Sequence, residues 1–170
     1  MRARRARLAD AAAIHALIAH YAARGILLPR TEKNVREHAA LFLVLEEKGN
    51  IAGCVSLETY GSDLAEVRSL AVSPEIRGRG LGARLVQFAL AEARRRKIAR
   101  VFAVTHAPDF FVRQGFTTSS RRALPEKIAR DCSGCPKANG CRLVAVIATV
   151  TPQRVALPIL NDIATSSPAT

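Results

Sequence analysis

The chain has 170 residues, with 26 lysines and arginines against 14 aspartates and glutamates, for a formal charge of +12. Its apolar fraction of 49% excludes a wholly disordered chain, which combines high charge with low hydrophobicity. No stretch approaches the 18 consecutive apolar residues of a transmembrane helix, and no secretory signal follows the basic start. We therefore expect a cytoplasmic protein that does not bind membranes. The positive charge favours an anionic partner, but few aromatic residues are available to stack on bases, so nucleic acid is not the expected one.

The first half of the chain predicts two helices and four strands. An amphipathic pattern predicts a helix from Ala11 to about Arg24, and Thr31 is expected to cap a short helix that ends at His38. Apolar runs predict strands over residues 2–7, 41–45, 51–60 and 64–73. The turn residues at 48–50 and 61–63 join the last three of these strands as hairpins.

The second half predicts a β-α-β unit. A helix is expected over residues 80–97, and a shorter one over 108–114; strands are expected over 100–105, 116–119 and 142–150. The pattern indicates a single α/β (α+β) domain over residues 1–150, with a mixed, mostly antiparallel sheet flanked by helices. Residues 151–170 are rich in proline, serine and threonine and are expected to form a loosely held C-terminal tail.

A glycine-rich turn precedes the long helix. It reads Arg77-Gly78-Arg79-Gly80-Leu81-Gly82, and we call it the glycine loop. Glycines let the main chain approach a ligand closely, and the free N–H groups of a first helical turn attract an anion. Two arginines beside those amides suit a pyrophosphate better than a single carboxylate. A merely solvent-exposed turn is the alternative that the residues leave open.

The glycine loop, preceded by Leu70-Ala71-Val72, resembles the acyl-coenzyme A signature of the GNAT family of N-acetyltransferases. The order of the predicted elements matches that fold over about residues 3–150. The resemblance implies that the amides around Arg77 to Gly82 bind the pyrophosphate of acetyl-coenzyme A. It also implies that Leu70, Ala71 and Val72 bond to the pantetheine arm as an added strand would.

Several separated segments also resemble short bacterial N-acetylglutamate synthases. They are residues 25–30, 51–54, 65–72, 109–116, 124–127 and 131–136. This resemblance implies transfer of an acetyl group to the α-amine of L-glutamate, the first step of arginine biosynthesis, by direct attack in a ternary complex. The chain lacks the amino-acid kinase domain of the long enzymes, which puts arginine feedback in doubt. A different amine as substrate, or a non-catalytic module that binds acetyl-coenzyme A or nucleic acid, is the alternative. A homodimer is compatible with the sequence.

The amine must lose a proton before it attacks the thioester. With a period of two along the strand, Glu66, Arg68, Leu70 and Val72 are expected to share one face. Glu66 is therefore the candidate base, acting directly or through water, unless it only forms a structural ion pair with Arg68.

Glutamate carries two carboxylates, so its site needs cationic anchors. The candidates are Arg30, Arg68 and Lys127, although each is also compatible with an ordinary surface charge. In many members of the family, a tyrosine on the helix before Gly115-Phe116 protonates the leaving thiolate. Phe110-Phe111 stands at that place, so water or another residue such as His106 has to serve.

Three cysteines lie in a loop expected over residues 131–141. Cys132, Cys135 and Cys141 would need a fourth ligand to bind zinc, and the usual pair of Cys-x-x-Cys units is absent. Free or partly oxidised thiols are therefore favoured over a metal site. Cys54 lies in an apolar strand and is expected to be a core residue.

Overall fold

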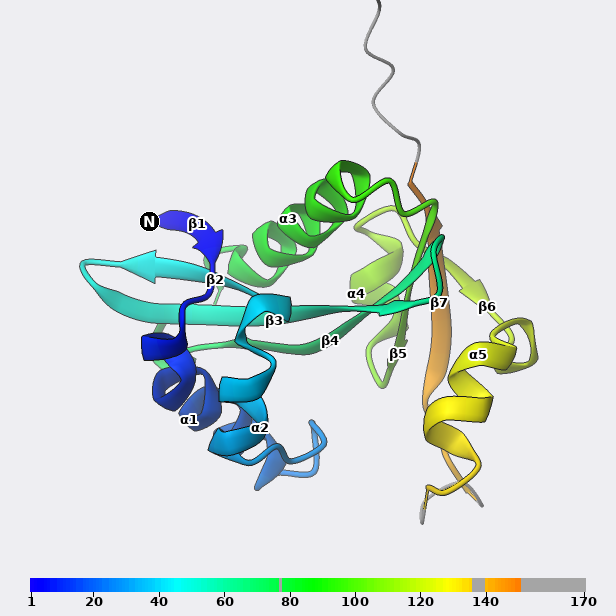
Figure 1. Ribbon diagram of the computed structural model, residues 1–170, viewed down its shortest axis with the longest axis horizontal. Helices are drawn as coiled ribbons and strands as arrows, with labels where there is room; N and C mark the ends of the chain where they lie inside the picture. The colour runs from blue at the N-terminus through cyan, green and yellow to red at the C-terminus, as the bar shows by residue number, and fades with distance from the viewer. Residues whose placement is uncertain (77, 136–139, 151–170) are drawn as a thin grey trace, which may run out of the picture.

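The computed structural model describes residues 1–76, 78–135 and 140–150 (Figure 1). The strands are β1 (Arg2–Arg5), β2 (Phe42–Glu47), β3 (Asn50–Tyr60), β4 (Leu64–Val72), β5 (Arg100–Thr105), β6 (Thr117–Ser119) and β7 (Val144–Thr149). The helices are α1 (Ala11–Ala22), α2 (Glu32–Glu37), α3 (Leu81–Arg95), α4 (Pro108–Val112) and α5 (Pro125–Lys127). Each predicted strand and helix that falls in the described residues is present, with its ends shifted by at most two residues.

The strands form one mixed sheet in the order β1-β2-β3-β4-β5-β7-β6. All neighbours are antiparallel except β4 and β5, which run parallel, as expected for the β-α-β unit that α3 completes. The β4–β5 pairing covers only Leu64–Glu66 against Arg100–Phe102. Beyond Glu66, β4 has no strand partner on its β5 side among the described residues, so this stretch of its edge is open.

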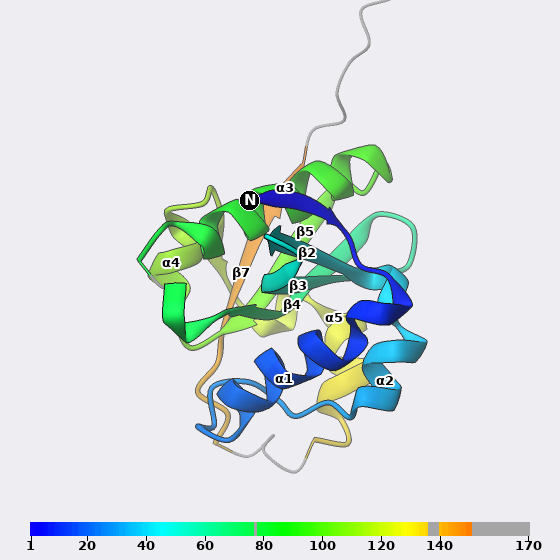
Figure 2. The ribbon, with the colours of Figure 1, turned by 90° about the vertical axis from the view of Figure 1, so that its left-hand side faces the viewer.

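Helices cover both faces of the sheet. Figure 2 shows α3 and α4 on one side, and α1, α2 and α5 on the other. The α3 side holds the larger core, because Leu81, Leu85, Ala89 and other apolar residues at helical spacing turn one stripe of α3 to the sheet. The α1 side is filled by residues such as Ile14 and Ile18. No helix in the described ranges is both long enough and apolar enough to cross a bilayer.

Thr31 caps the start of α2, as the sequence predicts. Thr31 has an extended backbone, and its hydroxyl accepts a hydrogen bond from the Asn34 amide at 3.1 Å, which caps the helix.

Cys54 is fully buried, as expected of a core residue, and burial raises the pKa of its thiol to about 12.

A β-bulge interrupts β4 at Ser69. In the β3–β4 pairing, Cys54 lies opposite Ala71 and Ser56 lies opposite Arg68, so β4 has one extra residue between these two pairs. Ser69 takes a φ of +51°, the left-handed region in which a bulge residue can be accommodated. The extra residue reverses the alternation of side chains along the strand.

The bulge overturns one prediction about β4. Leu70 and Val72 pack against the core on the α3 side, together with Val67. Glu66 and Arg68, which alternate with Val67, lie on the opposite side of the sheet. The four residues predicted to share one face are therefore divided into two pairs, because the period of two does not continue through the bulge.

Residues 121–132 are more helical than the sequence indicates. A 3-10 turn over Arg121–Ala123 leads into α5, and Ile128–Cys132 forms one π-helical turn. The loop expected to begin at residue 131 thus begins inside a helical turn. Of that loop, residues 136–139 lie outside the described part of the chain, as does the tail over 151–170.

Candidate active site

A cavity of about 300 Å³ lies beside the glycine loop, where β4 leads into α3. It is lined by Val72, Ile76, Gly78, Gly80, Leu81, Gly82, Ala83 and Phe110. Five of the residues predicted to bind the coenzyme are therefore in its wall, and Phe110 forms part of the same wall.

The backbone of the glycine loop explains why glycines occupy it. Gly78 and Gly80 have φ of +80° and +69°, and a Cβ at either position would project into open space. Gly80 is the N-cap of α3 and has no side chain to satisfy the first amides of the helix. A Cβ on Gly82 would lie 3.4 Å from Cζ of Phe110, so it would narrow the cavity. These residues fit an anion held on main-chain amides, as the pyrophosphate of coenzyme A would require.

Of the two arginines of the glycine loop, Arg79 lies within the described residues. Arg77 lies outside the described residues. Arg79 is half exposed and forms an ion pair with Glu47, with Nη2 3.3 Å from Oε1. In this structure its guanidinium is therefore directed to the β2–β3 hairpin.

The strand leading to the loop has its open edge at Leu70, Ala71 and Val72. These residues lie beyond the short β4–β5 pairing, so the edge there is available to an added strand, as the pantetheine contact requires. The Val72 carbonyl accepts a hydrogen bond from the Tyr21 hydroxyl at 2.5 Å, which ties this end of β4 to α1.

On the other face of β4, the three predicted anchors and the predicted base meet in one group of ionic contacts. We call it the polar cluster; its members are Arg30, Glu58, Tyr60, Glu66, Arg68, Lys127, Arg130 and Asp131. It draws on β3, β4, the loop before α2 and the α5 segment. Residues more than 60 positions apart in the chain, such as Glu66 and Lys127, are in direct contact in it.

Glu66 lies at the centre of the polar cluster and is only 3% exposed. Its Oε2 accepts a hydrogen bond from Tyr60 at 2.7 Å and one from Lys127 at 2.9 Å. Arg68 is a more distant ion-pair partner, with Nε 3.6 Å from Oε2. The Glu66–Arg68 pair that the sequence offered as a structural alternative is thus present, but Lys127 and Tyr60 are the nearer partners.

Arg30 and Arg68 share one carboxylate. Arg30 forms a short ion pair with Glu58 and lies over the Phe42 ring, while Arg68 Nη1 contacts the other oxygen of Glu58 at 3.1 Å. Burial disfavours the charged form of Glu58, but the positive charges of Arg68 and Arg30 outweigh it and lower the pKa of the carboxyl. Glu58 thus links Arg30 to Arg68, which also contacts Glu66.

Asp131 closes the polar cluster from the π-helical turn. Its Oδ2 accepts hydrogen bonds from Lys127 at 2.6 Å and from Arg68 at 3.2 Å, and it lies 2.8 Å from the Tyr60 hydroxyl oxygen, whose single proton is shared with Glu66. Burial opposes its ionisation, but the bonds from Lys127 and Tyr60 and the nearby positive charges lower the pKa of the carboxyl to about 2. Arg130 stacks on the Tyr60 ring, with Cζ 3.4 Å from its centroid.

Sequence reasoning missed Glu58, Tyr60, Arg130 and Asp131. Glu58 pairs directly with Glu66 across the β3–β4 ladder, so the hairpin register contained this signal. Lys127 and Asp131 are four residues apart, a spacing that brings side chains together on a helix. The Lys127–Asp131 spacing could not be used, because residues 124–132 had not been predicted to be helical.

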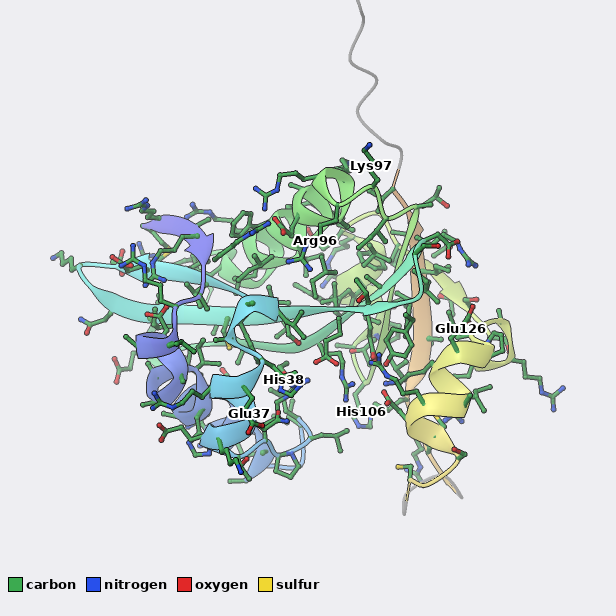
Figure 3. The ribbon with its side chains drawn as sticks, in the orientation of Figure 1. Glu37, His38, Arg96, Lys97, His106 and Glu126 are labelled. Atoms are coloured by element: carbon green, nitrogen blue, oxygen red, sulfur yellow. The ribbon has the colours of Figure 1, made fainter. Side chains whose placement is uncertain are left out.

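The residues considered for protonation of the leaving thiolate lie outside the polar cluster. Phe110 lines the cavity and Phe111 is buried in the core, and neither phenyl ring has a proton to donate to a leaving thiolate. His106 is exposed at the end of β5; Figure 3 shows it projecting below the sheet, on the side where His38 also lies. It contributes no contact to the polar cluster among the interactions of the described residues.

The three late cysteines are partly exposed thiols. The Cys135 amide donates to the Cys132 carbonyl at 3.2 Å, and Arg121 donates to the Cys141 carbonyl at 3.4 Å. Within the described residues, no three His, Cys, Asp or Glu side chains are grouped as a metal site requires.

Comparison with known proteins gives concordant matches. The model of the Acetyltransferase (GNAT) family matches residues 10–116. An uncharacterized N-acetyltransferase of Chlorobaculum tepidum is 41% identical over 147 residues, which cover 86% of this chain and 95% of that protein. An amino-acid acetyltransferase of Mycobacterium tuberculosis is 39% identical over 117 residues, which cover 67% of each protein.

A solved structure extends the likeness to three dimensions. N-acetylglutamate synthase from Neisseria gonorrhoeae, complexed with coenzyme A and N-acetyl-glutamate, superposes with a TM-score of 0.80 at 33% identity. The match covers 88% of this chain but only 35% of that one, so this chain spans about a third of the synthase. The sheet, the glycine loop and the family match together define an N-acetyltransferase fold. This chain belongs to the GNAT family of acetyltransferases.

Proposed function

We propose that this protein transfers the acetyl group of acetyl-coenzyme A to the α-amine of L-glutamate. The observation that carries the proposal is the polar cluster at one end of β4, in which Arg68 and Lys127 contact Glu66 and Arg30 contacts the neighbouring Glu58. The glycine loop follows the other end of the same strand. The distance from Glu66 to Val72 is about 20 Å along the strand, at about 3.3 Å per residue. The similarity to amino-acid acetyltransferases supports the same reaction.

The coenzyme site supplies the first half of the mechanism. Acetyl-coenzyme A, when bound, supplies an acetyl thioester that an amine can attack. The amides of Gly80, Leu81 and Gly82 would hold its pyrophosphate, and the open edge of β4 would direct its arm along the strand. Phe110 and Val72 give the arm an apolar wall.

The polar cluster supplies the second half. The cations hold the carboxylates of glutamate, and Glu66 accepts the proton that the α-ammonium must lose, directly or through one water. The amine nitrogen then bonds to the acetyl carbon as the carbon–sulfur bond breaks. The nitrogen gives up its second proton and the departing thiolate takes up one proton, both by exchange with water. The product of this reaction is N-acetylglutamate, and the reaction is the first step of arginine biosynthesis. We expect it to take place in the cytoplasm.

A comparison of three amino acids tests the substrate. We expect L-glutamate to be acetylated faster than L-glutamine or L-aspartate, measured as coenzyme A release at equal, subsaturating concentrations. Glutamine lacks the second carboxylate that could form charge-assisted hydrogen bonds with the cations of the cluster, and aspartate is too short to reach the same anchors at once. Faster turnover of any other amine would refute the glutamate assignment while leaving the family membership intact.

A further inference from the structure

The polar cluster holds its own anions as well as its cations. Its four cations are Arg30, Arg68, Lys127 and Arg130, and its three carboxylates are Glu58, Glu66 and Asp131. With all of these ionised, the cluster has a net charge of +1. A glutamate whose amine is uncharged and ready to attack carries two negative charges, one more than the cluster balances.

Asp131 is more exposed than the other two carboxylates, and it is carried by a helical turn and not by a strand. The side chain of Asp131 is 24% exposed, against 13% for Glu58 and 4% for Glu66. Glu58 and Glu66 project from the two central strands β3 and β4, which are paired along their length. Asp131 projects from one π-helical turn that follows the three-residue helix α5. The position of Asp131 therefore depends on side-chain contacts and not on strand pairing.

The contacts of Asp131 are those that a bound carboxylate would make. One oxygen, Oδ2, is within hydrogen-bonding distance of Lys127 Nζ, Tyr60 Oη and Arg68 Nη1. The other, Oδ1, contacts Arg130 Nε at 3.3 Å. Two of these donors, on Arg68 and Lys127, belong to residues that we assign to substrate binding.

We propose that Asp131 is a specificity-determining residue, because its carboxylate occupies the place among Lys127, Arg68 and Tyr60 that a substrate carboxylate takes. The inference rests on the proposed function, since it concerns the same site. Glutamate has to displace Asp131 or bind beside it against like-charge repulsion, whereas a carboxamide side chain avoids that repulsion. Asp131 therefore limits the preference of the site for a carboxylate over a carboxamide.

The Asp131→Asn variant tests this inference. Asparagine keeps the shape and loses the charge, so we expect the KM for glutamate to fall by about tenfold while the KM for glutamine changes little, as removal of a close like charge implies. The readout is the ratio of the two KM values and not kcat, because Tyr60 and Lys127, which contact Asp131, also bind Glu66. Asp131→Glu keeps the charge and should retain the wild-type ratio of the two KM values. Asp63→Asn, which removes only an exposed ion pair with Arg100, is the matched control.

The outcomes separate this inference from the proposed function. An unchanged ratio of KM values in a folded Asp131→Asn protein, or a rise in the KM for glutamate, would overturn the role of Asp131. If neither amino acid is a substrate of the wild type, the proposed function fails, and calorimetry with glutarate decides the inference alone. Tighter glutarate binding by Asp131→Asn than by the wild type would support it, and equal or weaker binding would overturn it.

Discussion

Replacing Glu66 with glutamine should lower kcat by about 100-fold or more, the usual contribution of a positioned acid or base. The variant keeps the shape of the side chain and its capacity to accept hydrogen bonds from Tyr60 and Lys127, but it cannot take up the amine proton. The affinity for acetyl-coenzyme A should stay nearly unchanged, because the glycine loop is not altered. Steady-state kinetics with glutamate and calorimetry with the coenzyme measure the two effects.

A purely structural Glu66 would behave differently. Its replacement would leave Lys127 and Arg68 with one counter-charge fewer, so the melting temperature would fall and the KM for glutamate would rise while kcat stayed nearly intact. The pH profile gives an independent readout, since a variant without the base should recover activity as rising pH deprotonates the free amine. A well-folded Glu66→Gln protein with the wild-type kcat would exclude Glu66 from proton transfer.

Replacing Gly80 or Gly82 with valine should abolish binding of acetyl-coenzyme A as measured by calorimetry. At Gly80, which lines the cavity, the new Cβ would project into open space, and the φ of +69° strains any β-branched residue. At Gly82 the backbone is ordinarily helical, so valine acts by filling the space beside Phe110. Two variants with different local effects therefore lead to the same expected loss.

A matched control distinguishes loss of the site from strain in the backbone. Gly61, in the turn between β3 and β4, also has a positive φ, +76°, and open space around its Cβ position, but it does not line the cavity. Gly61→Val should therefore lower the melting temperature and keep the affinity for the coenzyme. Unchanged affinity in both the Gly80 and the Gly82 variants would show that the coenzyme binds elsewhere.

The sequence was sufficient for the architecture because its signals are local. Hairpin turns at 48–50 and 61–63, the helical spacing of Leu81, Leu85 and Ala89, and the glycines after β4 each depend on neighbours in the chain. The mixed sheet and the position of the glycine loop followed from them. The cavity lies beside the residues that the sequence selected, and binding of the coenzyme there stays a prediction.

The polar cluster was only half predictable because its contacts are distant in sequence. Glu66 and Arg68 could be paired by alternation, but the bulge at Ser69 ended that alternation before Leu70. Asp131 reaches Arg68 only through a π-helical turn, which no residue pattern in the chain indicated. Arg130 and Asp131 depend on tertiary packing for their contacts with β3 and β4, whereas the contacts of Glu58 and Tyr60 with Glu66 lie within one hairpin.

The most direct test of the proposed function is to identify the product. The purified protein is incubated with acetyl-coenzyme A and an equimolar mixture of the twenty amino acids, and the acetylated products are separated and identified by mass spectrometry. We expect N-acetyl-L-glutamate as the main product, formed in step with coenzyme A release and lost in the Glu66→Gln variant. A different acetylated amino acid as the main product, or coenzyme A release without any acetylated amino acid, would contradict the proposal.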